Sequence, residues 1–387
     1  MKMALGLVAL LGVGTGPCRA APAGDQVRAA SPERASLDTQ DWSTYHGNYA
    51  LEGVSESAPP DAPGRLWRFK VEGRVHATPV AGGGKVHFAT DKGMVVALDL
   101  EGKEVWKVEL AKENFKAPLL LTERVLVLGS EEGNLYALDA GTGKPKWTYK
   151  MGGVIQGSAN RVDLRGGKKA VIVVSQSDGS IHCVDLEGGT LAWKTDPIDR
   201  SDGSPGVRDG RILLGSCASA LHVFSVDKEG KTADIEIGGD CQVAGGVAIS
   251  GTLAFAGTRS GKVVAVDVTA GKLVWTNEDC KKEVFTTPAV NAKVVVFGAE
   301  DGMVYALDRA TGRKLWDFDT GKTPSSPVIA GERVVVSAGG ALTMLELGTG
   351  KKLWSTPVSD EISSPALVGG RMIVGADDGT VSCYGRK

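Results

Sequence analysis

The residues of this sequence best suited to chemistry are its cysteines and histidines. Five cysteines follow the N-terminal region, and they are Cys183, Cys217, Cys241, Cys280 and Cys383. No two cysteines are adjacent, and no Cys-x-x-Cys-His haem attachment motif occurs. The five histidines are scattered without the spacing of a metal site, at His46, His76, His87, His182 and His222. The sequence therefore predicts no metal, no cofactor and no catalytic residues.

A second set of polar residues recurs at regular intervals. Acidic residues end apolar segments and precede glycine-containing turns, at Asp99, Asp139, Asp185, Asp227, Asp267, Asp308 and Glu346. A carboxylate in this position can accept hydrogen bonds from the backbone N–H groups of the turn that follows it. We therefore interpret these acids as structural carboxylates and not as catalytic pairs.

Internal repeats position these residues. Tryptophans recur about every 41 residues, with one interval of twice that length. They are Trp67, Trp106, Trp147, Trp193, Trp275, Trp316 and Trp354. In one unit, Gly302 marks a tight turn before the apolar segment 303–308, and Gly312 marks another before Trp316. Four short antiparallel strands per period are typical of a β-propeller blade.

The number of repeats predicts the architecture. First strands lie near Thr78, Ala117, Ser158, Ser204, Gly246, Thr287, Ser326 and Ser364. The last unit, 363–387, has three strands, and the segment 64–69 is an unassigned fourth strand. We expect an all-β, eight-bladed β-propeller of four-stranded antiparallel blades over residues 41–387. Pairing of the N-terminal and C-terminal strands closes the ring and removes exposed sheet edges.

The N-terminus predicts export. Residues 1–23 read as a signal peptide, with a basic Lys2, an apolar run from Ala4 to Val13 and small residues before the cleavage site. Residues 24–40 are polar and aperiodic, which indicates a flexible linker. Cys18 could carry a lipid anchor, although Thr15 and Pro17 depart from the lipoprotein pattern. The net charge of −2 and the absence of a basic stretch argue against nucleic-acid binding.

Two segments connect the repeats to a known family. Residues 137–147 and 306–316 match Ala-x-Asp-x-x-Thr-Gly-Lys-x-x-Trp, with Arg313 in place of lysine in the second segment. The chain resembles the pyrroloquinoline-quinone-like (PQQ-like) repeat propellers, and the segment 41–48 resembles the stretch that precedes their first blade. The resemblance implies that the seven tryptophans dock neighbouring blades. Blade 4 lacks one, near Asp234 or Ile235.

Two branches of this family suggest different functions. Quinone-dependent dehydrogenases are longer and use adjacent cysteines and calcium ligands, which are missing here. The other branch resembles the lipoprotein propeller subunit of the outer-membrane β-barrel assembly machinery. We therefore predict a non-enzymatic, monomeric scaffold that is periplasmic, associated with the outer membrane and binds a protein partner. A PQQ-dependent dehydrogenase and a small-ligand-binding propeller are the alternatives.

The predicted fold also positions the polar side chains. Cys217, Cys241 and Cys280 fall in loops of one face, and we expect a Cys217–Cys241 disulfide in preference to Cys241–Cys280. Cys183 and Cys383 lie in third strands and are expected to be buried. Small and hydroxyl residues of the first strands either relieve crowding at the axis or line a funnel. In a funnel, His76, Lys116 and Gln156 would contact a ligand.

Overall fold

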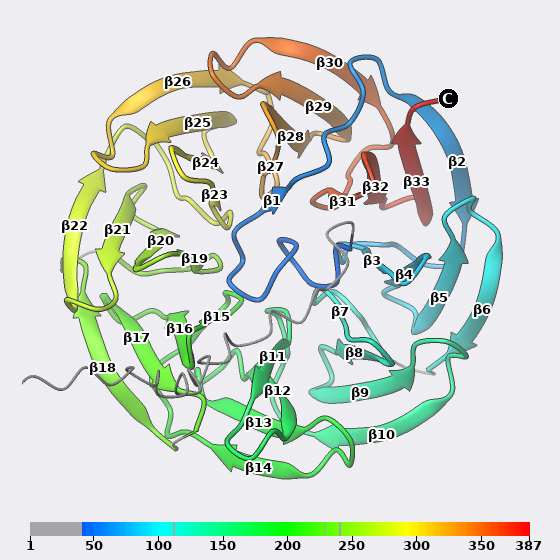
Figure 1. Cartoon of the computed structure of the whole chain (residues 1–387), viewed down its shortest axis with the longest axis horizontal. Helices are drawn as coiled ribbons and strands as arrows, with labels where there is room; N and C mark the ends of the chain where they lie inside the picture. The colour runs from blue at the N-terminus through cyan, green and yellow to red at the C-terminus, as the bar shows by residue number, and fades with distance from the viewer. Residues whose placement is uncertain (1–40, 111–112, 228, 240) are drawn as a thin grey trace, which may run out of the picture. The chain divides into compact units, whose positions relative to one another are not determined.

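Each repeat folds into a four-stranded antiparallel sheet, and eight sheets surround a central axis in the computed structural model (Figure 1). The structure describes residues 41–110, 113–227, 229–239 and 241–387. The predicted signal peptide, linker and Cys18 lie outside the described residues. All regular elements in the described ranges are strands, and none of these residues belongs to a helix that could span a bilayer. The predicted eight-bladed propeller is confirmed.

The first four blades follow one another along the chain, each from its inner to its outer strand. Blade 1 is β3 (Val80–Gly82), β4 (Lys85–Ala89), β5 (Met94–Asp99) and β6 (Glu104–Glu109). Blade 2 is β7 (Leu120–Leu121), β8 (Val125–Gly129), β9 (Asn134–Asp139) and β10 (Pro145–Lys150). Blade 3 is β11 (Asn160–Asp163), β12 (Lys169–Val174), β13 (Ile181–Asp185) and β14 (Leu191–Lys194). Blade 4 is β15 (Gly206–Arg208), β16 (Arg211–Gly215), β17 (Ala220–Ser225) and β18 (Lys231–Glu236).

The remaining blades include the two N-terminal strands. Blade 5 is β19 (Ala248–Ser250), β20 (Leu253–Gly257), β21 (Val263–Asp267) and β22 (Lys272–Asn277). Blade 6 is β23 (Ala289–Val290), β24 (Val294–Gly298), β25 (Met303–Asp308) and β26 (Lys314–Asp319). Blade 7 is β27 (Val328–Ala330), β28 (Arg333–Ala338), β29 (Ala341–Glu346) and β30 (Lys352–Pro357), with β1 (Val54–Ser55) added to it. Blade 8 is β31 (Ala366–Val368), β32 (Arg371–Gly375), β33 (Thr380–Gly385) and β2 (Gly64–Lys70).

Ring closure occurs in blade 8, as predicted. The N-terminal strand β2 pairs antiparallel with the C-terminal strand β33, and Trp67 lies opposite Cys383. The shorter strand β1 pairs in parallel with β27 of blade 7. Because β2 and the last strand share one sheet, blade 8 has its full four strands and the ring is closed.

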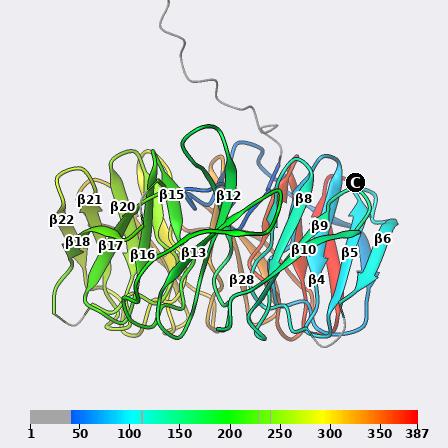
Figure 2. The same ribbon diagram turned by 90° about the horizontal axis from the view of Figure 1, so that it is seen from below.

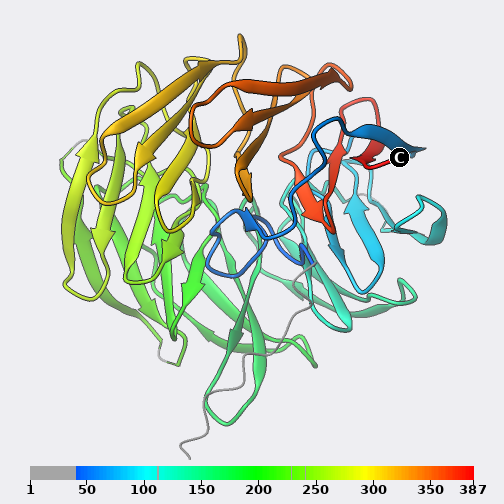
Figure 3. The same cartoon turned by 45° about the horizontal axis from the view of Figure 1, so that its top comes forward.

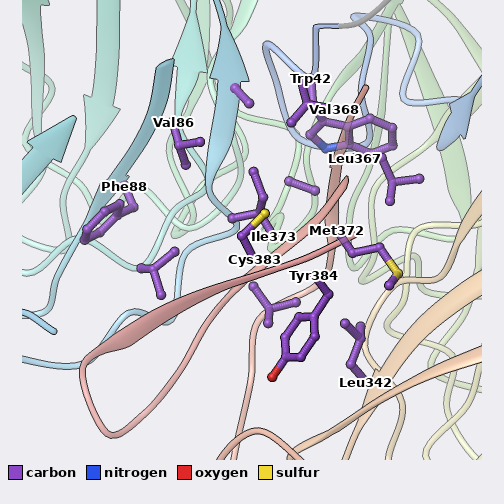
Figure 4. Packing of buried hydrophobic residues seen from close by; sticks show 14 of the residues in the cluster. Trp42, Val86, Phe88, Leu342, Leu367, Val368, Met372, Ile373, Cys383 and Tyr384 are labelled. Carbon is purple, nitrogen blue, oxygen red and sulfur yellow. The ribbon is translucent and has the colours of Figure 1, made fainter. Parts of the chain in front are cut away.

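The core lies between neighbouring blades. All five residues of β8 are buried, because the middle strands of a blade are covered on both sides by other blades. The outer strand β26 instead alternates between exposed and buried residues, and Trp316 is buried. Figure 4 shows one of these clusters, in which Trp42 packs near Leu367 and Val368 of β31.

Five of the seven tryptophans, which we call the regular tryptophans, join their blade to the next one through the same contacts. The Trp106 indole N–H donates to the carbonyl oxygen of Ala140 in blade 2, at 3.0 Å. A Cβ atom added to Gly143 would lie 2.6 Å from this ring, so the turn requires glycine there. The same pair of contacts recurs for Trp67 with Leu100 and Gly102, Trp147 with Leu186 and Gly189, Trp275 with Arg309 and Gly312, and Trp316 with Leu347 and Gly350.

The connections form two opposite faces of the ring. We call the face made of first-to-second and third-to-fourth turns the turn face. The face made of second-to-third turns and of the loops that link one blade to the next is the loop face. Figure 2 shows the strands running between the two faces, with the hairpin β11–β12 rising above its neighbours. The charged residues between Arg161 and Lys169 belong to this hairpin.

Candidate functional site

The segment 41–55 crosses the centre of the ring on the turn face (Figure 3). The Trp42 N–H donates to the Ala81 carbonyl oxygen at 2.7 Å, and the Ala81 N–H donates back to the Trp42 carbonyl oxygen at 2.9 Å. Further backbone bonds join the segment to inner-strand residues Leu121, Val207, Ile249, Val290 and Ile329. The segment is thus fixed to blades 1, 2, 4, 5, 6 and 7, and it covers the axis from this side.

Hydroxyl groups at the axis link adjacent blades. Ser204 Oγ accepts the Ser158 N–H at 2.9 Å, and Thr287 Oγ1 accepts the Gly246 N–H at 3.0 Å. The Tyr45 hydroxyl of the crossing segment lies 2.7 Å from Ser326 Oγ and 3.1 Å from Thr287 Oγ1. These hydroxyls, two residues before the first strands of their blades, therefore hold neighbouring blades and the crossing segment together.

The crossing segment contains a buried histidine. His46 is 1% exposed, and its Nδ1 lies 3.1 Å from the Leu51 carbonyl oxygen. Burial lowers the pKa of His46 to about 4, because the charged imidazolium would lose its hydration. His46 also has a positive φ of 58°, a conformation that ordinary residues adopt at some cost. His46 is thus a neutral structural residue at neutral pH.

The loop face remains open and displays an ordered set of side chains. The first residue of the second-to-third turn donates its N–H to a linking-loop carbonyl oxygen, for example Glu131 to Asn114 at 3.0 Å and Glu300 to Glu283 at 2.9 Å. This bond recurs in seven blades and gives the donor residues equivalent places around the axis. The donors are Asp91, Glu131, Gln176, Cys217, Arg259, Glu300 and Asp377.

The three predicted funnel residues all lie in linking loops of this face. His76 Nε2 is 4.0 Å from Asp91 Oδ2, and Lys116 Nζ is 2.9 Å from Glu131 Oε1. Gln156 is half-buried at the start of blade 3. Two of the three residues therefore pair with the acidic residue of their own blade. Their role as ligand contacts stays a prediction.

A polar network connects blades 3, 4 and 5 on the loop face. Asp202, in the loop that leads into blade 4, accepts hydrogen bonds from Gln176 Nε2 at 2.7 Å and Arg259 Nη2 at 2.7 Å. Arg200 adds bonds to the same carboxylate at 3.0 and 3.1 Å. The Asp202 side chain is only 16% exposed, so the carboxylate at the centre of this network is largely desolvated.

An exposed aromatic ring adjoins the network. Phe285 is 40% exposed in the loop that leads into blade 6, and the Arg259 guanidinium lies 5.2 Å from its ring centroid. The other large exposed hydrophobic residues of the described chain lie on outer strands, at Val105, Leu191, Leu273, Val274, Leu315 and Leu353. The loop face thus combines one accessible aromatic ring with rigidly held charges, which is the composition of a protein-contact surface.

The cysteines do not form the expected bond. Cys217 and Cys241 are both free thiols, which corrects the predicted disulfide. The physical reason is the direction of Cys241, which is 1% exposed and packs with Ile235 and Val243 in the core between blades 4 and 5. Cys217 is half-buried in a second-to-third turn. Cys183 and Cys383 are buried, as expected, and this burial raises the pKa of each to about 12, which leaves the thiols unreactive.

Blade 4 contains a polar arrangement that sequence spacing did not reveal. Ser216 Oγ lies 2.8 Å from His222 Nε2, and His222 Nδ1 lies 2.6 Å from Asp234 Oδ1. These are the contacts of a serine hydrolase triad. Ser216 is fully buried, however, and its Oγ already accepts the Ala218 N–H at 3.0 Å. We therefore assign the three residues a structural role. The strands of His222 and Asp234 were predictable, but their contact with each other and with Ser216 required the folded blade.

Metal ligands are not gathered anywhere in the described ranges. No group of three or more histidine, cysteine, aspartate or glutamate residues there could hold an ion. The acids at strand ends instead bind their turns, as Asp139 does by accepting the Thr142 N–H at 2.9 Å. Asp227 differs, since it lies beyond the end of β17 and accepts the Arg165 N–H of hairpin β11–β12.

Comparison with known proteins identifies the family to which the chain belongs. The family model described as outer membrane protein assembly factor BamB matches residues 59–195 and 177–386. The chain belongs to this family. Outer membrane protein assembly factor BamB of Burkholderia pseudomallei is 25% identical over 285 residues, covering 70% of this chain and 74% of its own. The family assignment confirms the predicted PQQ-like propeller resembling the assembly subunit.

Solved structures support the same fold. BamB from Moraxella catarrhalis superposes with a TM-score of 0.72 at 20% identity, covering 84% of this chain and 98% of its own. Quinohemoprotein alcohol dehydrogenase from Comamonas testosteroni gives a TM-score of 0.74 at 15% identity, covering 92% and 82%. An enzyme and an assembly factor thus share this ring of blades, so the ring alone does not decide between their functions.

Proposed function

We propose that the protein is a non-enzymatic scaffold of the cell envelope that binds a protein partner during assembly of outer-membrane proteins. The observation that carries this proposal is the family match across almost the whole propeller. The predicted signal peptide supports export to the periplasm, with association at the outer membrane. We further propose that the protein acts as a monomer. A lipid anchor at Cys18 is the alternative to removal of residues 1–23 as a cleaved signal peptide.

The loop face supplies the contact surface in this proposal. Phe285 offers an aromatic anchor, and Arg259 holds one side of its ring. Arg200 is exposed beside the bonded Asp202, where it can pair with a carboxylate of a partner. Aromatic and arginine side chains contribute most to protein interfaces, and a polar rim around them excludes water. This arrangement supports binding of a folded partner or an extended segment.

To test this proposal, the full chain carrying Phe285→Ala is expressed in the host, crosslinked in the cell envelope and then purified. We expect recovery of a crosslinked outer-membrane assembly component to fall about tenfold or more, because loss of an aromatic hot spot commonly costs at least ~2 kcal/mol. Leu315→Ala is the matched control, since Leu315 is 44% exposed but lies on an outer strand. Equal recovery of that component with both variants would show that the partner does not bind at Phe285 on the loop face.

A further inference from the structure

One joint of the ring has the receiving half of the tryptophan contact without the tryptophan. At each regular joint, a third-to-fourth turn supplies a glycine beneath the indole and a carbonyl oxygen for its N–H group. The residue with this carbonyl comes directly after the strand-end acid, as Leu347 follows Glu346. The corresponding turn of blade 5, residues 267–272, faces blade 4, whose outer strand has no tryptophan.

The turn of blade 5 has the same features as the occupied turns. Asp267 accepts the Thr269 N–H at 2.8 Å and so fixes the turn as the other strand-end acids do. Gly271 has a φ of 63°, close to the 70° of Gly312, which lies beneath a regular indole. Val268 has the place of the accepting residue, and its carbonyl oxygen accepts no hydrogen bond from any residue of the described ranges. The turn is therefore a receiving site for an indole.

Blade 4 leaves the position of the indole open. In its outer strand, Ala233 has the place that Trp316 has in blade 6. Ala233 is exposed, whereas Trp316 is buried. A Cβ atom added to Gly271 would meet no atom within 4 Å. We call the space between Ala233 and residues 267–272 the blade 4–5 slot.

Apolar side chains from both blades lie at this joint. Val223, opposite Ala233 in the ladder, packs with Val266 and Val268 of blade 5 in one core cluster. Leu273, which is 39% exposed, lies opposite Val266 and so on the same face of the sheet. A hollow of about 40 Å³, lined in part by Val268, shows that the joint is incompletely filled. The slot therefore offers apolar contacts to a flat ring beside a free hydrogen-bond acceptor.

The chain has no spare tryptophan for this slot. Seven of its eight tryptophans belong to blades, and the eighth, Trp42, is buried at 2% exposure. Residues 1–40 contain no tryptophan, tyrosine or phenylalanine. The occupant therefore has to come from another molecule. Five filled joints of the same construction indicate what its side chain is, because each of them holds an indole.

We propose that the blade 4–5 slot binds a tryptophan side chain from an extended segment of a partner protein. The indole lies over Gly271 and donates its N–H to the Val268 carbonyl oxygen, so that burial of the ring and one directed hydrogen bond both contribute. The bound ring fastens blade 4 to blade 5, as Trp316 fastens blade 6 to blade 7. The inference rests on the docking contacts of the ring and not on the proposed function, so its failure would leave the role of Phe285 untouched.

The experiment uses a docking strand of the chain itself as the probe. A peptide of residues 312–320, with a ¹⁵N-labelled indole at Trp316, is titrated with the unlabelled full chain and followed by NMR. We expect a saturable downfield shift of the indole N–H signal at concentrations on the order of 1 mM, because one ring and a short segment bury little area. The unlabelled peptide with Trp316→Ala should not displace the labelled one.

Two glycine variants of the full chain locate the binding site. Gly271→Ala should weaken binding by about tenfold or more, because its Cβ would occupy the place of the ring. Gly321→Ala is the matched control: it has a similar φ of 73° and open space at its Cβ, but it lies in a linking loop of the loop face. This control should bind the peptide as the unmodified protein does. Circular dichroism verifies that both variants are folded.

A third variant fills the slot from within the chain. Ala233→Trp combined with Val223→Ala copies the pair Trp316 and Ala306 of blade 6. It should have a higher urea midpoint than Val223→Ala alone and should bind the peptide at least about tenfold more weakly, because its own indole fills the space. Absence of a saturable shift, or equal weakening in the two glycine variants, overturns the proposal. Self-association of the chain that is lost in Gly271→Ala would overturn it in favour of a second copy as the occupant.

Discussion

Blades 6 and 4 have the same four-strand topology but are held in the ring by different side chains. In blade 6, Trp316 lies opposite Ala306 and donates its indole N–H to Leu347 of blade 7 at 2.7 Å. In blade 4, the register places Ala233 opposite Val223, at the position of the tryptophan. The missing tryptophan is therefore at Ala233, which corrects the expectation of Asp234 or Ile235.

Blade 4 differs on both of its sides. Trp193 of blade 3 is buried against it, but its indole N–H has no hydrogen-bond partner among the described residues. On the other side, a Cβ atom at Gly271 of blade 5 would meet no atom within 4 Å, whereas the equivalent Gly312 of blade 6 touches Trp275. Blade 4 instead holds its outer strand through Ser216, His222 and Asp234. The backbone ladder thus defines a blade, while several side-chain arrangements can dock it.

The largest expected effect is that of removing a regular docking residue. Trp316→Ala should lower the free energy of unfolding by about 3 to 5 kcal/mol, because it leaves a large cavity and an unpaired carbonyl group. Urea denaturation measures the change. Leu315→Ala, on the same strand but 44% exposed, should cost less than about 1 kcal/mol. A loss below about 1 kcal/mol for Trp316→Ala would show that indole docking does not support the ring.

Alanine variants of two glycines distinguish the contribution of indole docking to stability from that of backbone strain. Gly312 and Gly271 have similar positive φ values of 70° and 63°, but only Gly312 lies under an indole ring. Both alanine variants should lose about 1 kcal/mol for the left-handed conformation. Gly312→Ala should lose roughly 1 to 3 kcal/mol more, because its Cβ would lie 2.6 Å from Trp275. Thermal or urea unfolding of the two variants measures the difference between their losses of stability. Equal losses would mean that the space between blade 4 and Gly271 is as tightly packed as the contact between Trp275 and Gly312.

The smallest effect concerns the ionisation of His222. Burial lowers the pKa of His222, and the neighbouring Asp234 carboxylate partly opposes this shift. A lowered folded-state pKa means that the stability contributed by His222 is complete above its unfolded pKa of about 6.5 and is lost as the pH falls below it. Asp234→Asn should lower the pKa of His222 further, as an NMR titration of the imidazole would show. A pKa that rises in the variant would contradict the role given to Asp234.

The repeated features of the sequence predicted most of the fold. Tryptophan spacing, turn glycines and the unassigned strand 64–69 were enough for eight blades and for closure through β2 and β33, because each is a local pattern repeated along the chain. The candidate surface was only partly predictable. The linking loops of His76, Lys116 and Gln156 follow from the repeat, but no pattern joins Gln176, Asp202, Arg259 and Phe285, which come from separate blades.

By itself, the sequence determined the strands, their number and the buried middle of each blade, since hydrophobic periodicity and glycine turns act over a few residues. Only the tertiary structure decided how residues of different blades and loops meet. It directed Cys241 into the core instead of toward Cys217, placed the segment 41–55 across the axis, and brought Phe285 beside Arg259. These contacts depend on how the blades are packed around a common axis, and the spacing of residues along one chain does not encode that geometry locally.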